Sequence, residues 1–377
     1  MGGTSLSEKG QSSRMPPGCP ERYGSDMIRI LTPKAGETVT FFNEGQRDFI
    51  LGSYLSGPDE RTHIDKYKLL FPGAEEGTHE DSYPAPVVFT ASGCPEGAEL
   101  LICEQPADGN EKGHGSTMRV PMTVGADGTA SAGVYNFKIG TEYHAVVVSG
   151  AETSDAVTFV TEDLAPRLIR ADGGTNIRDI GAWKTADGKR LRQGMIYRSG
   201  EMDFRVEIRP EGIAALTDGL GIRTDLDLRG EAKEKTSSPL GERVNYRKLP
   251  VGDYDRFIQG GKECGNVKEI FELFADESAY PIIFHCQGGA DRAGSLAYTL
   301  ESILGISEKD KFLDYDLTTL SYYWVRARTS DCWKRMLDGF AAYGAEQSRT
   351  VQCERFLYDC GVTPETIEKI RKILIIG

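Results

Sequence analysis

The first half of the chain alternates short apolar runs with turn residues, a pattern typical of β-strands. Gly-Pro, Asp-Gly and Ser-Gly pairs separate the runs, and no helical period stands out among them. The apolar runs lie at residues 38–42, 86–90, 99–102, 143–148 and 158–161. We therefore predict an all-β sandwich of about seven strands over residues 26–162. Residues 1–25 are rich in Gly, Ser and Pro without any period, which predicts a disordered leader.

The pattern changes after residue 162, where strand-like and helix-like segments alternate. Strands are predicted at residues 195–197, 222–228 and 244–249, and helices at residues 210–218 and 267–274. Such alternation indicates an α/β domain over residues 163–377 with an at least partly parallel sheet. The last part is predicted to be helical at residues 309–318, 331–343, 351–360 and 364–374, with Thr363 as the N-cap before Pro364.

One segment of the second half carries candidate chemistry. Residues 282–284 predict a short buried strand, and residues 295–304 predict a helix. The Gly-rich loop between them opens with Cys286 and closes with Arg292, with five residues between the two. Backbone N–H groups of such a loop and the helix dipole bind anions and favour a reactive thiolate, and an Arg fork suits two phosphoryl oxygens. The alternative is a buried structural Cys beside a loop Arg.

Composition and charge narrow the classes of function. The 377 residues, 39% of them hydrophobic, suffice for two domains, and no apolar run is long enough for a transmembrane helix. The net charge is −13, and it lies mainly before residue 163, where 12 Lys and Arg face 23 Asp and Glu. This acidity argues against nucleic acid or an anionic membrane as the main partner. Because no signal segment is visible, two locations fit: the cytoplasm, or a secreted or periplasmic site reached by a signal since removed.

The eight cysteines form no C-x-x-C pair, which disfavours zinc and thioredoxin-like sites. Cys94 and Cys103 could form a disulfide in an oxidising compartment or remain two separate thiols. His285 is the only His after residue 144, and adjacent strand residues point to opposite faces, so it cannot easily serve Cys286 as a base. This disfavours a cysteine protease and a metal site, and we expect His285 to be a structural hydrogen-bonding group behind the loop.

Three ordered blocks resemble one known family. Residues 175–183 read T-N-I-R-D-I-G-A-W, residues 194–201 read G-M-I-Y-R-S-G-E, and residues 285–292 read H-C-Q-G-G-A-D-R. This order resembles that of the atypical bacterial tyrosine phosphatases, often called IphP-like, over residues 164–377. Residues 134–143 resemble a fibronectin type III turn, so the sandwich is expected to be fibronectin III-like or Ig-like.

The resemblance implies a Cys-dependent, dual-specificity or tyrosine phosphatase with neither a cofactor nor a metal. Cys286 would form the phosphocysteine, and Arg292 would hold the phosphoryl oxygens together with the N–H groups of Gln287, Gly288, Gly289 and Ala290. Arg178 and Asp179 would border the pocket, with Arg178 a possible second phosphate contact. Asp227 and Arg229 are expected to form an internal ion pair or to border the site, and we favour the ion pair.

The general acid has three candidates. Asp253 is the first, because it follows a predicted strand and lies about thirty residues before the loop, as in the movable acid loop of the family. Asp255 is the second, and Asp291 within the loop is the third. The alternative for each is an ordinary turn carboxylate.

Two residues depart from the family pattern and leave alternative functions open. Ala290 stands where the family commonly has Lys, which disfavours inositol lipid substrates. Ala293 stands where the family usually has a hydroxyl residue that helps the thiolate to leave. We predict a phosphotyrosine-like substrate, with a phosphoinositide or inositol phosphate phosphatase and a phosphate-binding pseudophosphatase as the alternatives.

Overall fold

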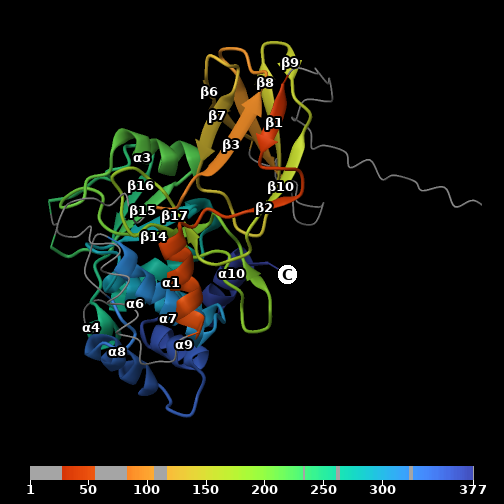
Figure 1. Ribbon diagram of the computed structural model, residues 1–377. Helices are drawn as coiled ribbons and strands as arrows, with labels where there is room; N and C mark the ends of the chain where they lie inside the picture. The colour runs from red at the N-terminus through yellow and green to blue at the C-terminus, as the bar shows by residue number, and fades with distance from the viewer. Residues whose placement is uncertain are drawn as a thin grey trace, which may run out of the picture. The chain divides into compact units, whose positions relative to one another are not determined.

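The computed structural model describes residues 28–55, 83–105, 117–231, 234–259, 264–321 and 326–376 (Figure 1). The contacts of the chain group into two compact units. The first holds Met1–Thr40, Pro86–Val134 and Gly140–Asp163, and the second holds Phe41–Ala85, Tyr135–Ile139 and Leu164–Gly377. This division differs from the single boundary expected after residue 162, because two earlier segments group with the second unit. The expected leader, residues 1–25, lies outside the described residues.

The first unit contains two β-sheets. One sheet has the strand order β1 (Arg29–Thr32), β3 (Val87–Ser92), β7 (Ala130–Val134) and β6 (Thr123–Val124). The other has the order β2 (Glu37–Val39), β10 (Val157–Thr161), β8 (Glu142–Ser149), β4 (Glu99–Glu104) and β5 (Thr117–Pro121), with β9 (Glu152–Thr153) paired to β8. Phe89 of the first sheet packs on Phe159 of the second, with ring centroids 5.4 Å apart. Cys94 and Cys103 are both buried free thiols.

A helix, α1 (Glu44–Leu55), follows the first two strands, so the expectation that this part of the chain lacks helices was wrong. The Asn43 side chain accepts a hydrogen bond from the Gln46 N–H at 2.8 Å, and the Gln46 side chain accepts one from the Asn43 N–H at 3.1 Å. This reciprocal capping satisfies two donors at the helix start. Phe49 and Ile50 are fully buried, so α1 adds to the core of the second unit.

The second unit is built around a six-stranded sheet. Its order is β11 (Arg167–Leu168), β12 (Arg178–Asp179), β14 (Ile196–Ser199), β17 (Ile282–His285), β15 (Thr224–Asp227) and β16 (Asn245–Lys248). The last four strands in this order are parallel, whereas β12 pairs antiparallel with both β11 and β14. β13 (Arg190–Leu191) and β18 (Ile375–Ile376) form a separate pair.

The helices follow the predicted order, with one helix, at Tyr254–Gln259, that was not predicted. They are α3 (Pro210–Ala214), continued by a π-helical turn at Ala215–Gly219, then α4 (Tyr254–Gln259), α5 (Cys264–Phe274), α6 (Arg292–Ile303), α7 (Glu308–Asp316), α8 (Asp331–Ala341), α9 (Arg349–Asp359) and α10 (Pro364–Leu374), with 3-10 turns at Glu277–Ala279 and Leu317–Leu320. The Thr363 side chain accepts a hydrogen bond from the Thr366 N–H, which confirms the predicted cap. None of the helices in the described ranges has the length and apolar character that a membrane span requires.

Both faces of strand β17 are covered, and this explains its uninterrupted apolar run. Ile283 packs in one cluster with Tyr197 and Leu216, on the face covered by α3 and its π-helical turn. The Phe284 ring lies 6.2 Å from the Phe274 ring of α5, on the other face. Figure 1 shows α3 and α6 on opposite sides of the sheet. A parallel strand covered on both faces needs side chains that are apolar on both faces.

Candidate active site

The predicted loop joins the carboxyl end of β17 to the first turn of α6. Cys286 follows the last strand residue, and Arg292 is the first residue of the helix. Cys286 is only 2% exposed, and Ala290 and Ala293 are fully buried. The loop therefore has the strand, turn and helix that an anion site at a helix N-terminus requires.

Three successive carbonyl groups of the loop accept hydrogen bonds from outside it. The Gln287 carbonyl binds the Glu201 N–H at 2.9 Å, the Gly288 carbonyl binds Asn176 Nδ2 at 2.9 Å, and the Gly289 carbonyl binds Arg198 Nη2 at 2.6 Å. Because C=O and N–H point in opposite directions within a peptide unit, these bonds turn the neighbouring N–H groups toward the interior of the loop. The sequence did not predict the roles of Asn176 and Arg198.

Gly289 shows why this loop needs glycine. Its φ is +65°, and a Cβ atom there would lie 2.4 Å from the Ser199 carbonyl oxygen. Any side chain at this position would push the loop away from β14.

Arg178 does not reach toward a phosphate, contrary to the expectation. It is 1% exposed, and its Nε donates to Asp314 Oδ1 at 2.7 Å, while another guanidinium nitrogen donates to the Asn176 side chain. Arg198 pairs with the same Asp314 carboxylate. The two arginines, Asp314 and Asn176 thus form one buried network that holds the carbonyl side of the loop.

Asp179 is also structural, rather than a residue that borders the pocket. Its fully buried carboxylate lies 2.8 Å from Arg167 Nη1 and accepts hydrogen bonds from the N–H groups of Gly181 and Gly194. These bonds tie β12 to the turn that precedes β14.

Asp227 and Arg229 form the internal ion pair that we favoured. Both Nε and Nη2 of Arg229 donate to the Asp227 carboxylate at 2.9 Å, and Arg229 Nη1 donates to Asp203 at 2.7 Å. Burial acts to raise the pKa of Asp227, but the Arg229 hydrogen bonds and nearby positive charge lower it to about 2. The pair anchors the chain where β15 ends.

This shift predicts how stability depends on pH. Because the folded-state pKa of Asp227 lies below its ordinary value of 3.8, the pair stabilises the fold above about pH 4 and ceases to do so as pH falls to about 2. We expect Asp227→Asn to lower the free energy of unfolding by about 2 kcal/mol at pH 6. Urea unfolding of both proteins at pH 6 and pH 3 measures the difference, which should shrink at the lower pH. A difference that stays constant or grows toward pH 3 would contradict the assignment.

Arg292 has a partner that sequence reasoning missed. Its Nη1 and Nη2 atoms each lie 2.7 Å from a different oxygen of Glu231, whose side chain is 56% exposed. Burial acts to lower the pKa of Arg292, but Glu231, Cys286 and Asp253 raise it above its ordinary value. Glu231 binds the two terminal nitrogens of the Arg292 guanidinium group and makes no hydrogen bond to its Nε atom. A carboxylate two residues after the buried Arg229 was the only sequence signal for this contact.

His285 lies behind the loop, where it was expected. It is fully buried, its Nε2 is 3.1 Å from Asp225 Oδ1, and its Nδ1 is 3.4 Å from the Cys286 carbonyl oxygen. Burial acts to lower the pKa of His285, but the carboxylates of Asp225 and Asp227 raise it above its ordinary value.

Each of the three acid candidates has a charged partner. Asp291 is held by Arg326 through bonds of 2.7 and 3.0 Å and accepts a hydrogen bond from the Tyr254 hydroxyl. Burial acts to raise the pKa of Asp291, but these partners lower it below its ordinary value, so it is ionised at neutral pH. Asp255 lies in α4 and faces Arg335 at 3.4 Å. Its lowered pKa makes Asp291 a poor proton donor to a leaving group.

The charge of Asp253 contributes to the raised pKa of Arg292, and the charge of Arg292 contributes in turn to the lowered pKa of Asp291. The Asp253 side chain is 27% exposed and meets the exposed Arg256 at 2.8 Å. Its carbonyl accepts the N–H groups of Arg256 and Phe257, which begins α4.

The family is shown by a match over most of the second unit. The sequence model described as the tyrosine phosphatase family matches residues 169–376, which is more than half of the chain. The chain belongs to the tyrosine phosphatase family.

Similar proteins include a curated protein of Cupriavidus necator whose name marks it as a candidate tyrosine-protein phosphatase. It is 27% identical over 164 residues, which cover 37% of this chain and 59% of the relative. This family member therefore spans about three fifths of the length of that relative.

Solved structures with some likeness include the core catalytic domain of the PP-IP phosphatase SIW14 from S. cerevisiae, in complex with citrate. It is 18% identical, covers 38% of this chain and 82% of that chain, and has a TM-score of 0.29. P. aeruginosa TpbA in complex with pTyr is 17% identical, covers 46% of this chain and 90% of that chain, and also has a TM-score of 0.29.

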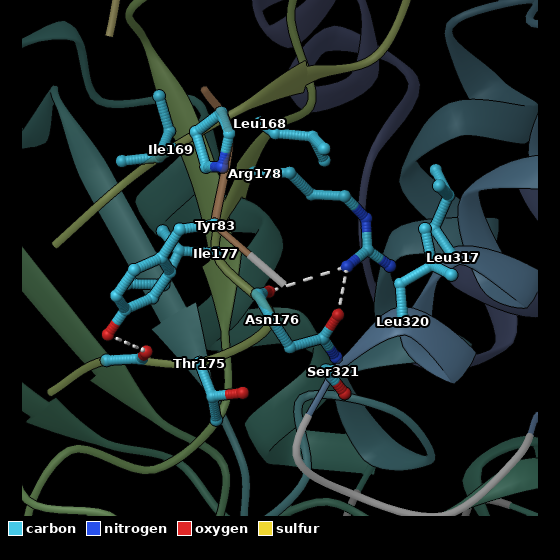
Figure 2. Close-up of a pocket in the computed structure, with 12 residues that line it drawn as sticks. Tyr83, Leu168, Ile169, Thr175, Asn176, Ile177, Arg178, Leu317, Leu320 and Ser321 are labelled. Carbon is cyan, nitrogen blue, oxygen red and sulfur yellow. Dashed lines mark hydrogen bonds between the residues drawn. The ribbon is translucent and has the colours of Figure 1, made fainter. Parts of the chain in front are cut away.

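Figure 2 shows a separate pocket of this phosphatase family member. It encloses about 410 Å³, part of it open to solvent, and is lined by Tyr83, Leu168, Ile177, Asn176, Leu317 and Ser321 among others. Neither Cys286 nor Arg292 is part of its lining, so it is not the phosphate site. Asn176 links this pocket to the Cys286–Arg292 loop, because it lines the pocket and also donates to the Gly288 carbonyl.

Proposed function

We propose that this protein is a phosphomonoesterase that acts on phosphotyrosine or a similar aryl phosphate through a phosphocysteine intermediate. The observation that carries the proposal is the loop itself, whose carbonyl groups are bound from outside and whose N–H groups are thereby turned inward at the N-terminus of α6. Donors fixed in advance around a developing negative charge stabilise it without reorganisation.

In the first step, the Cys286 thiolate attacks phosphorus, the S–P bond forms, and the bond from phosphorus to the phenolic oxygen breaks. Asp253 gives its proton to that leaving oxygen, while Arg292 and the N–H groups of Gln287, Gly288, Gly289 and Ala290 bind the phosphoryl oxygens. In the second step, water attacks phosphorus and gives a proton to Asp253. The S–P bond then breaks, and phosphate and the thiolate are released.

One observation bears on the class of substrate, and another bears on whether the site completes the reaction. Ala290 is fully buried and offers no cation for a second phosphate group, which favours an aryl monophosphate over an inositol polyphosphate. The alternative of a phosphate-binding pseudophosphatase is kept because Ala293 has no hydroxyl and the Ser295 hydroxyl is already used. Ser295 Oγ donates to the Asp291 carbonyl and accepts the Tyr254 N–H, both at 2.9 Å.

The function is tested by hydrolysis of phenyl phosphate with vanadate or a chelator added. We expect vanadate to inhibit, because it resembles the phosphoryl group in the transition state. We expect a chelator to have no effect, because the described residues include no group of three His, Cys, Asp or Glu side chains suited to a metal. Activity that requires an added divalent metal would reject the proposed chemistry.

Ala293 predicts a slow second step. Rapid mixing with an aryl phosphate should release a burst of phenol followed by a slow steady phase. Ala293→Ser should raise the steady rate about 10- to 100-fold, because a hydroxyl hydrogen bond to the leaving thiolate is worth about 1.5–3 kcal/mol. If the wild type shows no burst and the Ser variant no gain, another group assists the thiolate. If neither protein turns over, the pseudophosphatase is favoured.

We further propose that the first unit is a fibronectin III-like or Ig-like sandwich that serves as a spacer or docking domain. Its two sheets and the Phe89–Phe159 packing between them support this assignment. Residues 26–162 and 163–377 remain our proposed domain limits in the sequence, with the segments around α1 and residues 135–139 contributed to the phosphatase unit.

A further inference from the structure

Tyr254 follows the acid candidate Asp253 and has an unusual backbone. Its φ is +50°, in the left-handed region that side chains with a Cβ rarely adopt. The residue is nevertheless buried, with 8% of its surface exposed. A buried aromatic residue keeps such a conformation only where the surrounding contacts enforce it.

Those contacts come from the loop, from α6 and from α7. The Tyr254 N–H donates to Ser295 Oγ at 2.9 Å, and its hydroxyl donates to the Asp291 carboxylate. The Tyr315 hydroxyl lies 2.7 Å from the Tyr254 hydroxyl, and the two rings meet edge to face with centroids 6.4 Å apart.

The receiving groups are themselves fixed. Arg326 holds the Asp291 carboxylate through two bonds, and the Ser295 hydroxyl donates to the Asp291 carbonyl at 2.9 Å. Asp291 therefore serves as an anchor between the loop and Tyr254. Both ends of Tyr254, its N–H and its hydroxyl, are bound by residues within four positions of each other at the start of α6.

We propose that Tyr254 is a positioning residue that docks the acid segment onto α6 and thereby sets the place of the Asp253 carboxylate. The proposal rests on the proposed function, in which Asp253 protonates the leaving oxygen. Asp253 and Tyr254 share a peptide bond, so the direction of the Asp253 side chain follows from how Tyr254 is held.

The test compares leaving groups. Phenol has a pKa near 10 and needs a proton as it leaves, whereas dinitrophenol is acidic and does not. We expect Tyr254→Phe to lower kcat/KM, which reports the first step, about tenfold for phenyl phosphate and less than about twofold for dinitrophenyl phosphate. Ser295→Ala, which removes the acceptor of the N–H bond, should show the same selectivity.

Tyr280→Phe is the matched control. Tyr280 is also buried, and its hydroxyl donates to the Phe274 carbonyl at 2.7 Å, far along the chain from the acid segment. This variant loses one buried hydroxyl bond as well, but we expect it to slow both substrates equally or not at all.

Hydrogen exchange gives a readout that does not need turnover. The amides of residues 251–258 should exchange at least about tenfold faster in Tyr254→Phe than in the wild type, and no faster in Tyr280→Phe. Equal loss on both substrates, or unchanged exchange in this segment, would overturn the positioning role while leaving the phosphatase activity intact. A wild type that hydrolyses neither substrate would overturn the proposed function, and with it the role of Tyr254.

Discussion

Cys286→Ser should abolish turnover of aryl phosphates, with a loss of at least about 10⁴-fold in kcat. A Ser hydroxyl does not ionise at neutral pH, and the substitution leaves Arg292 and the loop N–H groups in place. The variant should therefore still bind the phosphoryl group of the substrate, and only formation of the S–P bond should be lost. Steady-state assays on phenyl phosphate measure the loss, and a binding titration with the same compound measures what remains.

Cys332→Ser is the control for this experiment. Cys332 is a half-buried thiol in the first turn of α8, and its Sγ accepts a hydrogen bond from Arg335 at 3.2 Å. It has no place in the proposed mechanism, so its replacement should leave kcat unchanged. Activity that survives Cys286→Ser would remove the covalent mechanism, whereas equal losses in both variants would point to general damage from replacing cysteine.

The second large effect is expected for Asp253→Asn, which should lower kcat/KM for phenyl phosphate about 100-fold. The variant should also lose the fall in kcat/KM that the wild type shows as pH rises through ionisation of its acid. For dinitrophenyl phosphate the loss should be small, because that leaving group needs no proton.

Asp291→Asn is the companion variant. Because Arg326 and the Tyr254 hydroxyl keep the Asp291 carboxylate ionised, this residue should not be the proton donor. We expect Asp291→Asn to lower kcat/KM for phenyl phosphate by a smaller factor, about tenfold, because the variant weakens docking of the acid segment. The fall in kcat/KM at high pH should be retained. A crippled Asp291→Asn beside a nearly normal Asp253→Asn would assign the acid to the loop instead, and normal rates in both would favour Asp255.

The local elements of the second half followed from the sequence because their signals are local. Residues 282–284 are apolar without interruption, as a strand covered on both faces requires. At the start of α10 the Thr363 side chain caps the helix, and Pro364 fits its first turn. The spacing of Cys286, the glycines and Arg292 likewise fixes a strand, turn and helix, so the candidate loop could be found without coordinates.

Helix α1 was missed although its start is encoded in four residues. Asn43 and Gln46 are spaced as a reciprocal cap, but the segment lies among strand-like runs and has only a weak apolar stripe. Burial of Phe49 and Ile50 in the second unit stabilises the helix, and such a contact depends on chain segments far away in the sequence.

The partners of charged residues were decided by the tertiary structure alone. Arg178 looked suited to phosphate, yet Asp314, 136 positions away, takes its guanidinium group. Glu231 pairs with Arg292 and Arg326 with Asp291 across separations of 61 and 35 positions. The sequence determined which side chains could do phosphoryl chemistry, because residue type and local spacing set that capacity. Only the folded chain determined which of them are neutralised in buried networks and which lie beside the sulfur, because the pairing of charges depends on contacts across the whole unit.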